Sequence, residues 1–576
     1  MGYRVTTTQR RAPDCIIVGY NEMPFPRFEQ AVRRFGVRSA AYRDLQFSFV
    51  NIDGEPHTWV DLLNHSERRA RLGSGTHNGF ADYRCGDIPN LAAVYLTNFL
   101  RRRGLIAEYV NLFQSEQDRF RELLQTDPRC VAITTTFYTT NDPATEIVEF
   151  VKKHRPGVPV IIGGPLIANH ARRYSDAELD FALDGLGADI YVVESQGEYT
   201  LYQVIETLRH GNPITAVPNL ILPMHGRFAK EQPREDALTL VPAHSRYIRT
   251  GAVPENNSLD ENAIDWSSTL QRSAGATLQT RTARSCAFKC AFCAYPTRAG
   301  ALTLASLDTI RRELQSMHEY GGIRNVVFVD DTFNVPLPRF KQLCRMLIEC
   351  GHPFRWYSYF RCNNADEEAI DLMAASGCAG VFLGIESGSQ RVLTNMSKSV
   401  TVEQYRHGIQ MLRDHGILTF GSLIAGFPGE TQETVDETIE FLHTVGLDYY
   451  RIQLWYCEPG TPIDQRRDEF QLQGVGFNWR HRTMDAQEAM SHIERTFRDI
   501  ETCWLPQWSF DFWILPYLAG RRIPMDAFKR YMLLTHRLLK LEFEPVREPN
   551  EQKILLEQIA NVAAEWCKPV VSLVSH

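Results

Sequence analysis

Short apolar runs alternate with longer amphipathic stretches along the chain, and this pattern predicts an α/β fold. In the first half, buried strands are expected at 14–20, 106–112, 130–136, 158–164 and the start of 189–211, with helices at 90–104, 143–157 and the end of 189–211. Strands that alternate with crossover helices form a doubly wound, Rossmann-like parallel sheet, which binds its ligands at the carboxyl ends of the strands.

The same alternation returns in the second half of the chain. Strands are expected at 276–284, 325–331, 355–361, 380–387, 418–430 and 450–460, with helices such as 306–320 and 435–446 between them. Six βα units are too few for an eight-unit barrel. They predict a partial (β/α)6 barrel that is open on one side and carries its reacting groups at the strand carboxyl ends.

These elements divide the chain into four parts. The first domain covers 13–235 and contains an insertion at about 25–88. Residues 236–275 show no sustained periodicity and are expected to form a connector. The barrel follows at 276–485, and a helical region at 486–576 is expected to cap its open side.

The length and the net charge of the chain limit the classes of function that the protein can have. The 576 residues, 44% of them hydrophobic, suffice for two or three domains, and a net charge of -7 gives no general attraction to nucleic acid or anionic membranes. The amino terminus lacks an apolar signal segment, and the longest apolar run, 158–168, is too short to cross a bilayer. A cytoplasmic protein is therefore expected. Its 13 cysteines argue against a disulfide framework there.

Three of these cysteines follow the first barrel strand at the spacing C-x3-C-x2-C: Cys286, Cys290 and Cys293. A structural zinc ion takes four ligands, and no histidine within twenty residues of Cys290 completes a zinc knuckle. Three thiolates can instead hold three irons of a [4Fe-4S] cluster and leave the fourth iron open to a ligand. The motif therefore predicts a reactive metal centre.

This motif, with Phe292 just before the last cysteine, resembles the signature of the radical SAM superfamily. The resemblance implies that the amine and carboxylate of S-adenosylmethionine (SAM) bind the open iron and that reduction yields a 5'-deoxyadenosyl radical. It also implies a flavodoxin or ferredoxin as electron donor.

Further residues match the family's motifs in order. Asp330 or Asp331, in "VDDTFN", is implied to accept hydrogen bonds from the SAM amine, and Arg361 to pair with its carboxylate. Glu386 and Ser387 resemble the segment that contacts the ribose. The segment 423–431, with Gly426, resembles the one that supports adenine through backbone groups.

Polar and glycine-rich loops follow the strands of the first half. They carry Thr134, Thr135 and Thr136, then Gly163 and Gly164, then the loop "ESQGE" with Glu198. Such strand ends suit a large polar ligand with phosphate or amide groups.

The order of these motifs resembles the cobalamin-binding domain that precedes the catalytic domain in many radical SAM proteins. Ser195 and Gln196 depart from that family's usual G-E-G-E-x-T-L loop. The cobalt-binding pattern D-x-H-x-x-G is absent after the first strand. His65 and His77, in the insertion, are the candidate cobalt ligands, and the alternative is that no histidine coordinates cobalt.

Together, the two resemblances imply methyl transfer to an unactivated carbon or a phosphinate phosphorus of a small secondary metabolite, free or carrier-bound. The run 458–485 resembles the subgroup of phosphinate P-methyltransferases and antibiotic C-methyltransferases, the class B radical SAM methyltransferases. The candidate substrate-pocket residues are Trp455, Tyr456, Trp479 and His481. The alternatives are a non-methylating cyclisation or oxidative rearrangement, a sensor that holds a cluster without turnover, and a first domain that binds no cobalamin.

Overall fold

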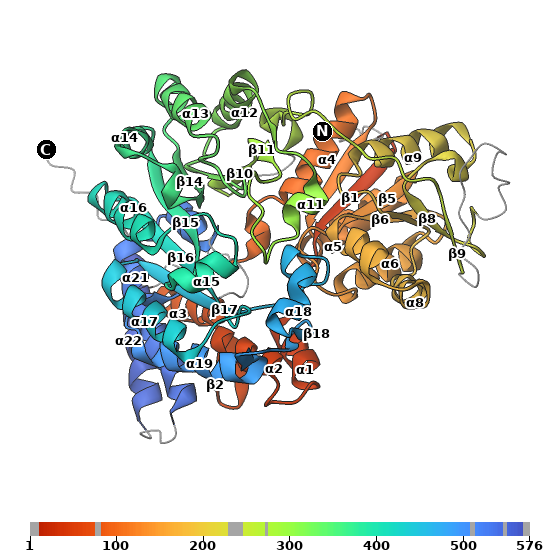
Figure 1. Ribbon diagram of the computed structural model, residues 1–576. Coiled ribbons are helices and arrows are strands. Elements are labelled where there is room, and N and C mark those ends of the chain that lie inside the picture. The colour runs from red at the N-terminus through yellow and green to blue at the C-terminus, as the bar shows by residue number, and fades with distance from the viewer. Residues whose placement is uncertain are drawn as a thin grey trace, which may run out of the picture. The chain divides into compact units, whose positions relative to one another are not determined.

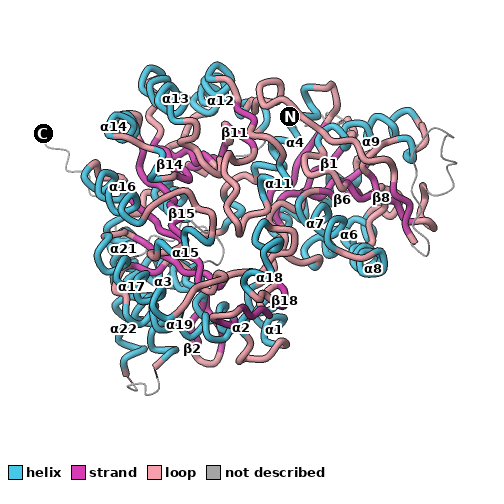
Figure 2. The backbone as a smooth tube through the Cα atoms, viewed as in Figure 1, coloured by secondary structure: helices cyan, strands magenta, loops and turns pink. Residues whose placement is uncertain are grey.

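The chain forms two α/β units, each built around its own sheet, which is mainly parallel in the first and wholly parallel in the second (Figures 1 and 2). The computed structural model describes residues 11–74, 82–228, 246–270, 275–506, 513–544 and 550–567. The first unit contains Met1–Met23, Pro89–Ser273 and Arg312–Glu319, and the second contains Pro24–Ile88, Ala274–Arg311 and Tyr320–His576.

The sheet of the first unit has the strand order β4-β1-β5-β6-β7-β8-β9. Five strands are parallel, as predicted: β4 (Ala107–Leu112), β1 (Cys15–Tyr20), β5 (Cys130–Thr134), β6 (Val160–Gly163) and β7 (Ile190–Val192). Two further strands, β8 (Leu220–Pro223) and β9 (Tyr247–Arg249), extend the sheet, and each is antiparallel to the strand before it in the sheet order. The sequence pattern did not predict them, and β9 lies within the segment expected to be a connector.

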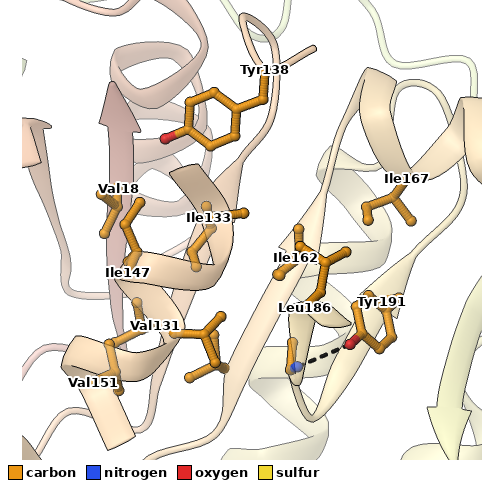
Figure 3. Close-up of a cluster of buried hydrophobic side chains, with 14 of the residues drawn as sticks. Val18, Val131, Ile133, Tyr138, Ile147, Val151, Ile162, Ile167, Leu186 and Tyr191 are labelled. Atoms are coloured by element: carbon orange, nitrogen blue, oxygen red, sulfur yellow. Dashed lines mark hydrogen bonds between the residues drawn. The ribbon is translucent and has the colours of Figure 1, made fainter. Parts of the chain in front are cut away.

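Helices cover this sheet and bury its apolar side chains. Val131 and Ile133 of β5 belong to one buried cluster with Ile147 and Val151 of α6 (Figure 3). Burying each such side chain stabilises the fold by about 1.5–3 kcal/mol. The hydroxyl of Tyr191 in this cluster accepts from the Ala188 amide at 2.9 Å and donates to the Leu183 carbonyl. The helices are α4 (Leu91–Arg102), α5 (Phe113–Gln125), α6 (Asp142–His154), α7 (Pro165–Arg173), α8 (Asp176–Leu186), α9 (Glu198–His210) and α10 (Trp266–Thr269).

The sheet of the second unit is parallel throughout, in the order β10-β13-β14-β15-β16-β17-β21. Its strands are β10 (Thr277–Thr280), β13 (Asn325–Phe328), β14 (Arg355–Phe360), β15 (Cys378–Glu386), β16 (Leu418–Ala425), β17 (Tyr449–Leu454) and β21 (Cys503–Trp504). The six predicted barrel strands are thus confirmed, and β21 is an addition. Among the described residues the outer strands β10 and β21 do not pair with each other, so the barrel is partial and open.

Helices between these strands, and short elements around them, complete the barrel half. They are β11 (Ala283–Arg284), α11 (Tyr295–Ala299), β12 (Thr303–Leu304), α12 (Leu307–Tyr320), α13 (Leu337–Cys350), α14 (Glu367–Ala375), α15 (Gln390–Asn395), α16 (Val402–Asp414), α17 (Gln432–Val445), α18 (Arg467–Phe470), β18 (Gln473–Val475), β19 (Asn478–His481), β20 (Met484–Asp485) and α19 (Ala486–Asp499). Strands β18, β19 and β20 form a separate small antiparallel sheet.

The insertion belongs to the second unit and packs with the carboxyl-terminal helices. The ring of Phe47 lies 5.1 Å from that of Phe497 on α19, and the Tyr531 hydroxyl donates to the Trp59 carbonyl at 3.1 Å. The elements of the insertion are α1 (Phe25–Arg33), α2 (Ala40–Leu45), β2 (Phe49–Ile52), β3 (Glu55–Thr58) and α3 (Trp59–Ser74).

The predicted carboxyl-terminal helices are present as α20 (Ile514–Gly520), α21 (Met525–Lys540) and α22 (Glu551–Cys567). Helix α20 packs against the amino ends of two barrel strands, because Thr277 and Asn325 both donate to the Pro516 carbonyl, at 3.0 and 2.7 Å. Helix α20 therefore lies at the amino ends of these two strands, and a cap over the open side of the barrel stays a prediction.

Within the described part of the chain, no helix combines the length and the apolar character needed to cross a bilayer.

Candidate active site

One row of side chains identifies the inner face of the barrel. The strand register aligns Tyr359, Phe382 and Phe420, and their rings lie 4.8 and 5.0 Å apart. Because side chains alternate along a strand, Arg361 lies on the same face two residues beyond Tyr359. The Arg361 guanidinium lies 3.6 Å from the ring of Phe288, which stands between the first two cysteines of the motif. This face therefore meets the cysteine loop.

The cysteine loop runs from β11 to α11 and is fixed by its backbone. The Cys293 amide donates to the Cys290 carbonyl at 3.1 Å. Ala291 donates its amide to Met396 and accepts at its carbonyl from Ile463, at 2.8 and 2.9 Å. These bonds tie the loop to the segments that follow α15 and β17.

The three thiols are free, with Cys290 buried and Cys286 and Cys293 partly exposed. Burial, with smaller contributions from the neighbouring Cys290, Asp331 and Cys286, raises the pKa of Cys293 to about 11. An iron that binds here must therefore displace a proton from Cys293.

Within the described ranges, no three histidine, cysteine, aspartate or glutamate side chains converge on one metal-ion position.

The two adjacent aspartates have different surroundings. Asp330 is 2% exposed, and its Oδ1 accepts from the amides of Thr282 and Ala283 at 2.6 and 3.0 Å. Its Oδ2 accepts from the Thr282 hydroxyl. Asp330 therefore holds the segment that leads into the cysteine loop, and its role toward the SAM amine stays a prediction.

The Asp331 residue is exposed, yet desolvation of its carboxylate, with a smaller contribution from the charge of Asp330, raises its pKa to about 7. Its charge acts on Cys293, so it lies near the thiols. Of the two aspartates, Asp331 is the one available to a ligand.

The Arg361 side chain can bind an anion. It is 6% exposed, and its Nε donates to Asn363 Oδ1 at 3.0 Å. Its Nη2 is buried and has no hydrogen-bond partner among the described residues. Leaving a buried guanidinium N–H unpaired is costly, so a carboxylate at this position is the chemistry that fits.

Glu386 and Ser387 lie at the end of β15. Glu386 has φ +66° and forms a buried ion pair with Lys398 at 2.7 Å. The Ser387 hydroxyl accepts from the Ser389 amide at 3.1 Å and lies 3.3 Å from that of Thr438. Ser387 thus shapes the turn, and a contact of either residue with ribose stays a prediction.

The candidate pocket residues separate into two groups. Trp455, Trp479 and His481 are buried, and they pack beneath Gly426 at the end of β16. Tyr456 is 49% exposed and packs on Phe477 at 5.1 Å. Only Tyr456 presents its ring to solvent.

The threonine and glycine loops of the first unit fit closely together. Gly164 has φ +102°, and a Cβ there would lie 2.9 Å from the Thr135 hydroxyl, which donates to the Gly163 carbonyl at 2.8 Å. The hydroxyls of Thr134 and Thr136 lie 3.0 Å apart at the carboxyl end of β5. Thr135 therefore shapes the edge, and the exposed Thr136 can meet a ligand.

The loop "ESQGE", expected to suit phosphate or amide groups of a ligand, leads into α9, and the amino end of this helix already binds a carboxylate of the protein. Glu255 accepts from the amides of Tyr199 and Thr200, both at 2.8 Å. Asn257 Nδ2 donates to Glu198 Oε2 at 2.8 Å and to Glu255. Glu255 thus caps the helix. The sequence pattern missed it because it lies far from α9, in the supposed connector.

A role for the two candidate cobalt ligands stays a prediction. His65 is exposed on α3 in the second unit, and His77 lies outside the described residues.

An open parallel barrel with a three-thiol loop after its first strand defines a radical SAM domain. The family model of the radical SAM superfamily matches residues 280–442, and that of the B12 binding domain matches residues 81–193. The chain is therefore a radical SAM enzyme that carries a B12-binding domain. These domains imply a [4Fe-4S] cluster, SAM and cobalamin as cofactors.

Similar proteins share both halves. An uncharacterised methyltransferase of Pyrococcus horikoshii is 25% identical over 414 residues, 70% of this chain and 84% of that one. The anaerobic magnesium-protoporphyrin IX monomethyl ester cyclase of Rubrivivax gelatinosus is 24% identical over 384 residues, 63% of each chain. The solved structure of the radical SAM methyltransferase TsrM from Kitasatospora setae, with cobalamin and a [4Fe-4S] cluster bound, has the same fold. The match has a TM-score of 0.58 at 18% identity and covers 83% of this chain and 97% of TsrM.

Proposed function

We propose that the protein is a cobalamin-dependent methyltransferase that moves a methyl group from SAM, by way of cobalamin, to an unactivated carbon or a phosphinate phosphorus of a small molecule. When bound, the cluster and SAM supply a radical, and the corrinoid carries the methyl group. Methylation by SAM alone needs a nucleophile, which such an acceptor lacks at neutral pH.

The unpartnered Nη2 of the buried Arg361 guanidinium, beside the cysteine loop, carries the proposal. Cys286, Cys290 and Cys293 would hold the cluster, and Arg361 would take the SAM carboxylate. Asp331, exposed near the thiols, would accept from the SAM amine. In the first unit, the edge formed by Thr134, Thr136 and the two glycines would bind the corrinoid.

The ion pair of Glu386 with Lys398 would orient a carboxylate oxygen toward the ribose. It is buried, and Lys398 also donates to the Gly384 carbonyl, so the glutamate has little freedom to turn away. No sequence motif pointed to Lys398, which lies twelve residues beyond its partner.

The acceptor is proposed to be a small secondary metabolite, free or carrier-bound. Support comes from the likeness of the run 458–485 to methyltransferases of antibiotic biosynthesis, and from the likeness to the P. horikoshii methyltransferase.

Transfer of label from SAM tests the proposal. Reconstituted protein is incubated without oxygen with CD3-labelled SAM, a reductant and a metabolite extract from its source. We expect an intact CD3 group in one new product, together with S-adenosylhomocysteine and 5'-deoxyadenosine. The matched Cys290→Ala protein should form neither the product nor 5'-deoxyadenosine. Cleaved SAM without transferred label would refute methyl transfer.

A second candidate is a non-methylating cyclisation or oxidative rearrangement, which the likeness to the cyclase of R. gelatinosus supports. It differs in one product: 5'-deoxyadenosine would form on turnover without S-adenosylhomocysteine.

A further inference from the structure

The peptide that follows β16 is confined by the small β18-β19-β20 sheet and by α19. Gly426 has φ +89°, a left-handed conformation that side chains disfavour. A Cβ at this position would collide with the indole of Trp479 and lie 2.9 Å from the Cβ of Ala489. The backbone therefore lies directly against Trp479.

Both polar groups of Gly426 are bound to buried side chains. Its amide donates to the Glu430 carboxylate, and its carbonyl oxygen lies 3.2 Å from Nε2 of His481. A carbonyl only accepts, so the proton of the imidazole is on Nε2. Nδ1 then accepts from the Thr483 amide at 3.4 Å and lies 3.1 Å from the Thr483 hydroxyl.

These contacts define a neutral His481 with a single tautomer. The side chain is 7% exposed, and burial lowers its pKa. Both ring nitrogens already have protein partners, so His481 has no free group with which to contact a ligand directly.

A row of rings fixes the orientation of the imidazole. His481 stacks on Trp479 with an interplanar angle of 3° and a centroid distance of 5.3 Å. Trp479 donates its Nε1 proton to the Trp455 carbonyl at 2.8 Å. Trp455 in turn packs on Phe427, the residue after Gly426, at 5.4 Å. The histidine is thus held against the loop that it bonds.

We propose that His481 is a positioning residue for SAM: its Nε2 proton fixes the Gly426 carbonyl, and with it the backbone of the loop that supports the adenine. The inference rests on the SAM-binding part of the proposed function and on the resemblance that assigns the adenine to the segment 423–431. It replaces a substrate-pocket role for His481 by a role in cofactor affinity.

Two variants test the Nε2 proton of His481 and its aromatic ring separately. His481→Phe keeps a ring for the stack on Trp479 and loses the donor. His481→Gln loses the ring and keeps an N–H that can reach the same carbonyl. The affinity for SAM is measured by equilibrium dialysis on anaerobically reconstituted protein with cluster and cobalamin. L-methionine, which has the amine and carboxylate of SAM without the adenine, is the control ligand.

We expect His481→Phe to weaken SAM binding about five- to tenfold, the value of one lost hydrogen bond, and His481→Gln to stay within about twofold of the wild type. The affinity for L-methionine should be the same in all three proteins. A loss of L-methionine binding in parallel with SAM binding would overturn the inference. So would equal SAM affinity in His481→Phe and wild type, or equal losses in the two variants.

The outcome is distinguishable from that of the label-transfer experiment. Wild-type protein that binds SAM but transfers no CD3 group would refute the proposed methyl transfer and leave the role of His481 intact.

Discussion

Replacing Asp330 by leucine should detach the segment that leads into the cysteine loop. Leucine has a similar shape but no acceptor, so the buried amides of Thr282 and Ala283 would lose their partner. Each unpaired buried amide costs about 1–3 kcal/mol, which gives roughly 2–6 kcal/mol in all. Thr282 lies four residues before Cys286, so the loop should lose its register and bind iron poorly.

Asp330→Asn is the matched control. The asparagine Oδ1 can still accept from both amides. The substitution also removes the negative charge of Asp330, which burial already disfavours, as its raised pKa indicates. Asparagine should therefore keep most of the iron and of the thermal stability. The assays are iron and sulfide per chain after anaerobic reconstitution, and thermal unfolding of the same samples.

The contrast also separates two roles for Asp330. If it bound the SAM amine, both variants would lose SAM affinity and retain iron. Leucine and asparagine variants with equal iron content would therefore refute the bracing role derived from the hydrogen bonds.

Three further predictions follow from single contacts. Arg361→Met should weaken SAM binding at least tenfold with iron content unchanged, because a charge-assisted hydrogen bond is worth about 1.5–3 kcal/mol; a parallel loss of iron would mean that Arg361 mainly braces Phe288. Glu255→Ala should cost about 0.5–2 kcal/mol at the start of α9, seen as faster hydrogen exchange of the Tyr199 amide with unchanged exchange in the barrel helices. Burial raises the pKa of Asp44 from 3.8 to about 6, so the folded state binds the carboxyl proton more tightly than the unfolded state does. The folded protein therefore loses stability as the pH rises from 3.8 through about 6. Asp44→Asn should therefore stabilise the protein by up to about 3 kcal/mol at pH 8 and by less at pH 5, and an equal gain in melting temperature at both would contradict this.

The long apolar strands were predictable because each carries its own periodic signal. The strands missed in the two large sheets are short: β8 has four residues, β9 has three and β21 has two, so none of them shows a clear period. They are strands because a neighbouring strand offers them a free edge, and that edge exists only in the folded sheet.

The residues of the candidate site also fall into those that the sequence indicated and those that only the fold reveals. The spacing of the cysteines alone indicated their chemistry. Which of the neighbouring Asp330 and Asp331 faces the thiols could not be read from the sequence, because it depends on where Thr282 lies in the fold. The partners Lys398 and Glu255 were missed for the same reason, since their bonds join segments brought together by tertiary packing.

The assignment of the insertion to the second unit affects how the protein can be divided. The chain passes between units at 23–24, 88–89, 273–274, 311–312 and 319–320. A fragment cut at the B12-binding match, 81–193, would lack β1, the strand that pairs with both β4 and β5. A fragment ending near 235 would keep β1 but would carry the insertion without the helices on which it packs. The halves are therefore not exchangeable modules, and a graft of this B12-binding half onto another barrel would have to rejoin the chain at several points.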